Sequence, residues 1–167
     1  AFKAAIELIE SAKRPLIYAG GGVIAAEAAE ELKRFRAKID SPVTLSLMGL
    51  GAFPASDKAF TGMIGMHGTK TTSLAISECD LLIAVGARFS DRVTCNIQTF
   101  APNAKVLHID TDRAEIDKNV KTDNSIIGDA KLVLERLAKT VKQQHHDEWM
   151  NKIYEWEGEY PIHKPYD

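Results

Sequence analysis

Residues 80–87, DLLIAVGA, are the part of this sequence that most restricts its fold. After the opening aspartate every residue is apolar or small, and the run has the length of a strand rather than of a helix. A strand that is apolar along its whole length is typical of a parallel sheet covered by helices on both faces. The run therefore predicts a buried parallel strand in an α/β protein.

Predicted strands and helices alternate along the rest of the chain. Apolar residues recur at helical spacing over residues 3–12, 25–37, about 69–77 and from 130 onward. The predicted strands lie at 15–22 (running into glycine), 41–47, 60–68, 80–87, 105–110 and 125–129. This order indicates an α/β fold with a mostly parallel six-stranded sheet and right-handed crossovers.

Length, charge and cysteine content limit the function classes. The chain has 167 residues, which suits one domain, and its net charge of −2 predicts neither nucleic acid nor an anionic membrane as a partner. Cys79 and Cys95 stand far apart, which predicts neither a zinc site nor a disulfide framework. No apolar run approaches the ~20 residues that cross a membrane. Because the sequence begins within a helical pattern, we expect a piece of a longer protein: a globular domain over 1–145 and a polar, aromatic tail or linker over 146–167.

Ligands of open α/β sheets bind beyond the carboxyl ends of the strands, so residues at these ends are the candidate site. Gly20, Gly21 and Gly22 end the first strand, where bare backbone and the following helix could receive a phosphate; the alternative is a glycine turn without a ligand. Arg88 and Arg92, with Asp91 between them, follow the fourth strand and suggest an anionic ligand; the alternative is a local salt bridge.

The remaining strand ends carry weaker signals. The loop GMIGMHG after the third strand could line a flat aromatic ligand, or it is a flexible loop. Asp110 ends the fifth strand, where it could accept hydrogen bonds from two ribose hydroxyls or cap a loop. Asp129 is expected to cap the last helix, and Asp112 with Glu115 fits a capping box. Together, glycines, arginines and an acid at successive strand ends suit a long, bent, phosphate-bearing ligand such as a dinucleotide.

Several segments, in this order and spacing, resemble the middle domain of the catalytic large subunit of acetolactate synthases (acetohydroxyacid synthases), which are thiamine-diphosphate enzymes. The segments are PVTLSLMGLGAFP, GMIGMHG, VGARFSDRVT, HIDTDRAEI and GDAKLVLERL. The resemblance covers about residues 1–145. It implies a Rossmann-like, three-layer α/β/α domain of the DHS-like NAD/FAD-binding type, with FAD as its cofactor.

The resemblance also implies a role for individual positions. The positions that match the family's FAD contacts are Gly20, Gly21, Gly22, Ser46, Leu47, Met48, Gly65, Met66, His67, Gly68, Gly86, Ala87, Arg88, Ile109, Asp110, Gly128 and Asp129. Arg92 matches an arginine that faces the 2-keto acid in the catalytic pocket, and Asp91 is expected to orient it. Ser90 and Cys95 depart from the family, which commonly has aspartate and glycine there. A glycine at the second position can have a positive φ, so the resemblance suggests a positive φ at Cys95.

What the resemblance implies for the parent protein is broader than this chain. The family condenses pyruvate with pyruvate or 2-ketobutyrate in branched-chain amino acid biosynthesis, using thiamine diphosphate and magnesium, while FAD has a structural role. The thiamine motifs of the family's outer domains are absent from this sequence, so we expect no carboligase (transferase) activity from this chain alone. The expected partners are the flanking domains, a second copy in a homo-oligomer, a regulatory small subunit and 2-keto acid substrates. The expected location is the cytoplasm in a bacterium, or an organelle in a eukaryote.

Three alternatives stay open at this point. The chain could be an NAD-binding module or NAD-dependent enzyme of sirtuin-like fold, which the lack of paired CxxC motifs disfavours. It could be an electron-transfer module with a redox-active flavin. It could belong to a glyoxylate-type carboligase, which should differ at RFSDRVT.

Overall fold

The computed structural model describes residues 1–65 and 68–161, and in it six strands form one parallel sheet in the order β3-β2-β1-β4-β5-β6. The central strands are β1 (Pro15–Ala19) and β4 (Leu81–Val85). The outer strands are β2 (Val43–Leu45), β3 (Phe60–Met63), β5 (Lys105–Asp110) and β6 (Asn124–Ile127). The predicted α/β fold with a six-stranded parallel sheet is therefore confirmed.

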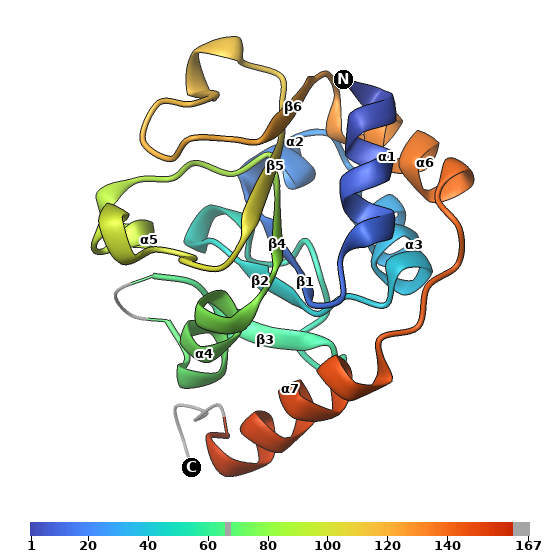
Figure 1. Cartoon of the computed structure of the whole chain (residues 1–167). Helices are drawn as coiled ribbons and strands as arrows, with labels where there is room; N and C mark the ends of the chain where they lie inside the picture. The colour runs from blue at the N-terminus through green and yellow to red at the C-terminus, as the bar shows by residue number, and fades with distance from the viewer. Residues whose placement is uncertain (66–67, 162–167) are drawn as a thin grey trace.

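Helices cover both faces of the sheet (Figure 1). One face is packed by α1 (Phe2–Ser11), α2 (Gly21–Ala25), α3 (Ala29–Ile39) and α6 (Ala130–Thr140), and the other by α4 (Lys70–Glu78) and α7 (Asp147–Glu159). Short elements fill the connections: α5 (Asp91–Thr94) and the 3-10 helices η1 (Leu47–Gly49), η2 (Ile97–Thr99) and η3 (Arg113–Glu115).

Strand β4 has the burial that its sequence predicts. Ile83 and Val85 enter the core under α3 and α6, whereas Leu82 and Ala84 enter the core under α4 and α7. All of these side chains are fully buried, and each large aliphatic one contributes about 1.5–3 kcal/mol to stability.

The structure corrects two predicted helices. Residues 25–37 are not one helix, because Glu27 takes a positive φ of 54° and separates α2 from α3. The helix expected near Asp112 is only the single turn η3, although Asp112 does accept a hydrogen bond from the Ala114 backbone N–H at 2.9 Å.

The segment 146–167, predicted to be a tail or linker, begins with helix α7. Trp149 of this helix is buried, and its indole N–H donates to the Pro15 carbonyl at 2.8 Å. His146 precedes the helix and is held by the Asp40 carboxylate, which accepts its backbone N–H at 2.6 Å. The helix is thus part of the packed structure, and the connection to a further domain stays a prediction. Within the described residues, no helix is long and apolar enough to cross a membrane.

Candidate functional site

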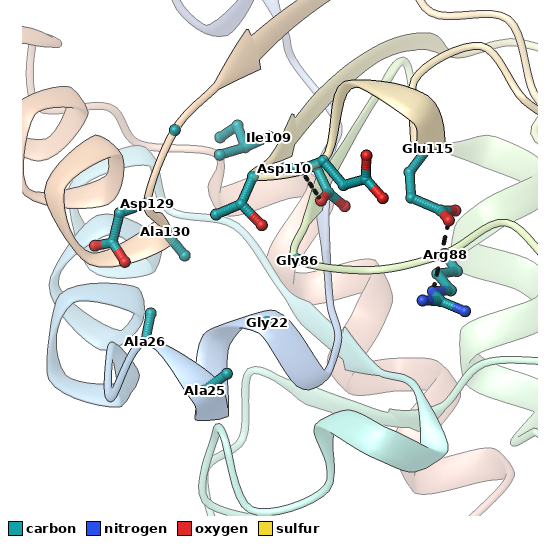
Figure 2. A pocket seen from close by; sticks show the side chains of 13 residues that line it. Gly22, Ala25, Ala26, Gly86, Arg88, Ile109, Asp110, Glu115, Asp129 and Ala130 are labelled. Carbon is teal, nitrogen blue, oxygen red and sulfur yellow. Dashed lines mark hydrogen bonds and ion pairs between the residues drawn. The ribbon is translucent and has the colours of Figure 1, made fainter.

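A pocket of about 330 Å³ opens at the carboxyl ends of β1, β4, β5 and β6 (Figure 2). It joins residues that are distant in the sequence but were all predicted for the site: Gly22, Gly86, Arg88, Ile109, Asp110, Gly128 and Asp129. Ala25 and Ala26 of α2 line it as well, as do Asp112 and Glu115 from the connection after β5. The geometry of parallel strands brings these residues together, because all six carboxyl ends lie at one edge of the sheet.

Two glycines set the distance between the first and fourth strand ends. A Cβ on Gly22 would lie 2.6 Å from the Cα of Gly86, and a Cβ on Gly86 would lie 2.6 Å from the Cα of Gly22. The Gly22 N–H donates to the Gly86 carbonyl at 2.9 Å, and Gly86 has a φ of +57°. Gly20 is equally confined, since its Cβ would lie 2.6 Å from the same carbonyl oxygen. These glycines therefore allow the backbone turns after β1 and β4 to pack against each other, and this contact alone requires glycine there.

Four carboxylates border the pocket. Asp110 is largely buried; its Oδ1 accepts the Asp112 backbone N–H at 2.9 Å, and its Oδ2 lies 3.5 Å from Nε2 of His108. Asp129 caps α6, as predicted, by accepting the Leu132 N–H at 3.1 Å. Carboxylates accept hydrogen bonds, so this part of the rim favours hydroxyl donors, such as those of a ribose.

Arg88 brings the only guanidinium to this pocket in the described part of the chain. Its side chain is 79% exposed, and its Nε lies 3.8 Å from a carboxylate oxygen of Glu115. The same oxygen lies 3.6 Å from Nζ of Lys118. Glu115 was expected to complete a capping box, but its carboxylate pairs with these two cations instead. The guanidinium is the exposed member of this pair, and such pairs are worth about 0–1 kcal/mol. It could therefore turn to an anionic ligand at low cost, while Glu115, only 12% exposed, keeps Lys118 as its partner.

Ser46, Leu47 and Met48, which were also predicted to contact the cofactor, lie at the end of the neighbouring strand β2, outside this pocket. Ser46 caps η1 after β2, and the following side chains of Leu47 and Met48 are 68% and 77% exposed. Gly21 lies directly against Met48, where an added Cβ would be 3.3 Å from the methionine Cβ. This strand end thus offers an apolar surface next to the glycine turn.

The loop after β3 meets the segment after β4. Gly65 has a φ of +108°, and a Cβ there would lie 2.7 Å from the backbone oxygen of Arg92. Gly68 donates its N–H to the Gly65 carbonyl at 2.8 Å and precedes α4. Met66 and His67, predicted to lie beside a flavin, fall outside the described residues.

Asp91 and Arg92 are both exposed and begin α5. In the described chain no ion pair joins their side chains within 4.0 Å, so the orienting role of Asp91 stays a prediction. Cys95 ends this helix with φ 59° and ψ −63°. The positive φ that the family's glycine suggested at this position is therefore present, although the residue is cysteine.

Three polar residues around the Arg88 segment were missed by the sequence analysis: Tyr18, His108 and Asn119. The Tyr18 hydroxyl donates to the Arg88 carbonyl at 2.6 Å, and Asn119 donates to the Phe89 carbonyl at 2.7 Å. Burial raises the pKa of Tyr18 far above its ordinary value, so the phenol stays protonated and donates. The available signal was a polar tip within an otherwise apolar strand, PLIYA. Among the described residues, no cluster of three histidine, cysteine or acidic side chains could hold a metal ion.

Comparison with known proteins places the chain among enzyme domains. Residues 2–137 match the family described as thiamine pyrophosphate enzyme, central domain. The chain is 47% identical to the acetolactate synthase large subunit of Parasynechococcus marenigrum over 99% of its length, and 51% identical to a probable acetolactate synthase large subunit of Methanocaldococcus jannaschii over 92%. It is 45% identical to the large subunit of Corynebacterium glutamicum over 94%. It spans only 26–27% of these three relatives, about a quarter of their length.

Proposed function

Because the chain belongs to the family of thiamine pyrophosphate enzyme central domains, we propose that it is the FAD-binding central domain of an acetolactate synthase large subunit. The observation that carries the proposal is the pocket at the strand ends. Seven residues predicted for cofactor binding, from segments spread between residues 22 and 129, line one cavity there.

The residues present fit a dinucleotide in two parts. The pocket, at about 330 Å³, is at the small end of the ~300–1,000 Å³ range of ligand sites, so it suits the adenosine end. Asp110 would accept ribose hydroxyls, and Arg88 would pair with a phosphate. The flavin end would extend along the neighbouring strand ends, over Leu47 and Met48, whose exposed apolar side chains suit a flat ring. When bound, FAD would supply that ring as a structural element of the parent protein.

The relatives are named acetolactate synthase large subunits, and for the parent protein we propose the reaction that the family resemblance implies: condensation of pyruvate with a second 2-keto acid. Thiamine diphosphate and magnesium would be held by domains outside this chain. Arg92, exposed at the start of α5, would face the keto acid there and Asp91 would support it. The flanking domains, a second copy of the parent and a regulatory small subunit are the proposed partners.

Titration of the purified chain tests the cofactor. We expect FAD to bind with a shift of its visible absorption, ADP to compete, and NAD to compete far less well. Binding of NAD where FAD does not bind, or displacement of FAD by NAD at equal concentration, would favour an NAD-binding module. Reduction of the bound flavin followed by electron transfer to a partner protein would favour an electron-transfer module instead.

A further inference from the structure

The segment that carries Arg88 is held by its backbone carbonyl groups. Four successive carbonyls, of residues 86 to 89, each accept a hydrogen bond from a different part of the fold. The donors are the Gly22 N–H (2.9 Å), His108 Nε2 (2.9 Å), the Tyr18 hydroxyl (2.6 Å) and the Asn119 amide (2.7 Å). Three of these donors are side chains, contributed by β5, by β1 and by the connection between η3 and β6.

His108 links two parts of the site at once. It is fully buried, and its Nε2 lies 2.9 Å from the Ala87 carbonyl and 3.5 Å from Oδ2 of Asp110. A carbonyl oxygen can only accept, so we assign the ring proton to Nε2. His108 thus holds the strand end before Arg88 by a hydrogen bond, and its ring lies beside the carboxylate at the end of β5.

Tyr18 acts on the next peptide group. Its ring packs edge-on against Phe89, with 5.6 Å between the ring centroids, and Phe89 packs edge-on against His108 at 5.3 Å. The two donors therefore belong to one aromatic cluster beneath the segment. Packing restricts their rings, so their hydrogen bonds fix the carbonyl directions tightly.

Fixed carbonyls also fix the N–H groups. In a planar trans peptide, the N–H of one residue points opposite to the carbonyl of the residue before it. The carbonyls of residues 87 and 88 point toward His108 and Tyr18, so the N–H groups of Arg88 and Phe89 point away from them. Neither N–H donates to an acceptor in residues 1–65 or 68–161. Buried and half-buried backbone donors normally have a partner, and the N–H of the buried Phe89 has none in the protein described.

We propose that Tyr18, His108 and Asn119 are positioning residues for nucleotide binding: they hold the segment 86–89 so that the guanidinium and the backbone N–H of Arg88, which lines the pocket, meet the anionic diphosphate of the ligand. This inference rests on the function proposed above. It assigns these three side chains a role in affinity that acts through the Arg88 segment rather than through contact with the ligand.

The test compares the affinities of four proteins for FAD and for ADP at 25 °C. Tyr18→Phe removes one hydroxyl but retains the ring, and we expect binding about fivefold to tenfold weaker, which corresponds to one lost hydrogen bond. Asn119→Ala lies on an exposed connection and should weaken binding about twofold to fivefold without unfolding the chain. Ser41→Ala is the matched control, because the buried Ser41 hydroxyl also donates to a backbone carbonyl, that of Pro42 at 2.8 Å. Ser41 precedes β2 and so lies at the amino ends of the strands, away from the pocket.

A second pair of variants separates positioning from packing. His108→Gln retains an N–H donor and should bind both ligands within about threefold of the wild type, whereas His108→Leu has no donor and should lose about tenfold or more. Thermal midpoints are measured alongside. Because Ser41→Ala lowers the midpoint through a similar lost bond, unchanged affinity in that control shows that stability alone does not set binding.

The possible results point in different directions. Wild-type affinity in both Tyr18→Phe and Asn119→Ala overturns the positioning role while the proposed function stands. A loss in Ser41→Ala equal to that in Tyr18→Phe also overturns it. If Tyr18→Phe does not fold, Asn119→Ala decides. Absence of binding of both FAD and ADP to the wild-type chain overturns the proposed function itself.

Discussion

Replacing Cys95 by glycine should stabilise the protein. Cys95 has φ 59° and ψ −63°, a backbone conformation that costs a residue with a Cβ about 1–3 kcal/mol and costs glycine little. The side chain offers little in return: it is exposed, and its Sγ lies 3.9 Å from the Arg92 carbonyl. Against this gain, glycine gives the unfolded chain more conformational freedom, which lowers the free energy of unfolding by about 0.4–1 kcal/mol. The net gain is therefore about 1 kcal/mol, which corresponds to a thermal midpoint about 2–4 °C higher at this chain length.

The assay is thermal unfolding of the purified chain followed by circular dichroism under reducing conditions. Cys95→Ala is the matched control, because it removes the thiol but retains the Cβ and hence the strain. We expect its midpoint to stay within about 1 °C of the wild type. The reasoning is refuted if Cys95→Ala stabilises as much as Cys95→Gly, or if Cys95→Gly lowers the midpoint.

Further expected results concern the pocket, the parent enzyme and helix α7. Burial, and then the nearby charge of Asp57, raise the pKa of Glu157 in helix α7 from 4.5 to about 7, so the folded chain binds this proton more tightly than the unfolded chain does. The free energy of unfolding should therefore fall as the pH rises from 4.5 through about 7. Glu157→Gln should flatten that fall between about pH 5 and 8 in denaturant titrations. Gly22→Ala should lower stability by about 1–3 kcal/mol in the same assay, because its Cβ has no room. Arg88→Ala should weaken FAD binding about tenfold or more by titration, and unchanged affinity would remove it from the site. In the full-length parent, Arg92→Ala should reduce acetolactate formation more than FAD content, and normal kinetics would show that its role was misassigned.

Much of the fold could be predicted from the sequence because the buried strands are short, continuous apolar runs. The run DLLIAVGA is apolar on both faces, and the structure buries it on both faces. Parallel topology then brings the strand ends to one edge, so Gly22, Arg88 and Asp110 could be placed together without coordinates.

What the sequence does not reveal depends on long-range contacts. The break between α2 and α3 falls at Glu27, where neither glycine nor proline marks it. Glu115 has the spacing of a capping residue, yet its carboxylate pairs with Arg88, which is separated from it in the sequence by strand β5. In the sequence Tyr18 has the pattern of a core aromatic residue, and only the structure shows that its hydroxyl donates to the Arg88 carbonyl.

The reciprocal contact of Gly22 with Gly86 makes the width of the pocket a property of the main chain. Neither glycine can gain a side chain without moving the other, so the turns after β1 and β4 form one rigid unit. Substitutions around the rim can then change the charge and chemical preference of the opening while its span stays constant. Ligand preference in such a domain is therefore free to vary at Arg88, Asp110 and Glu115 without rebuilding the scaffold beneath them.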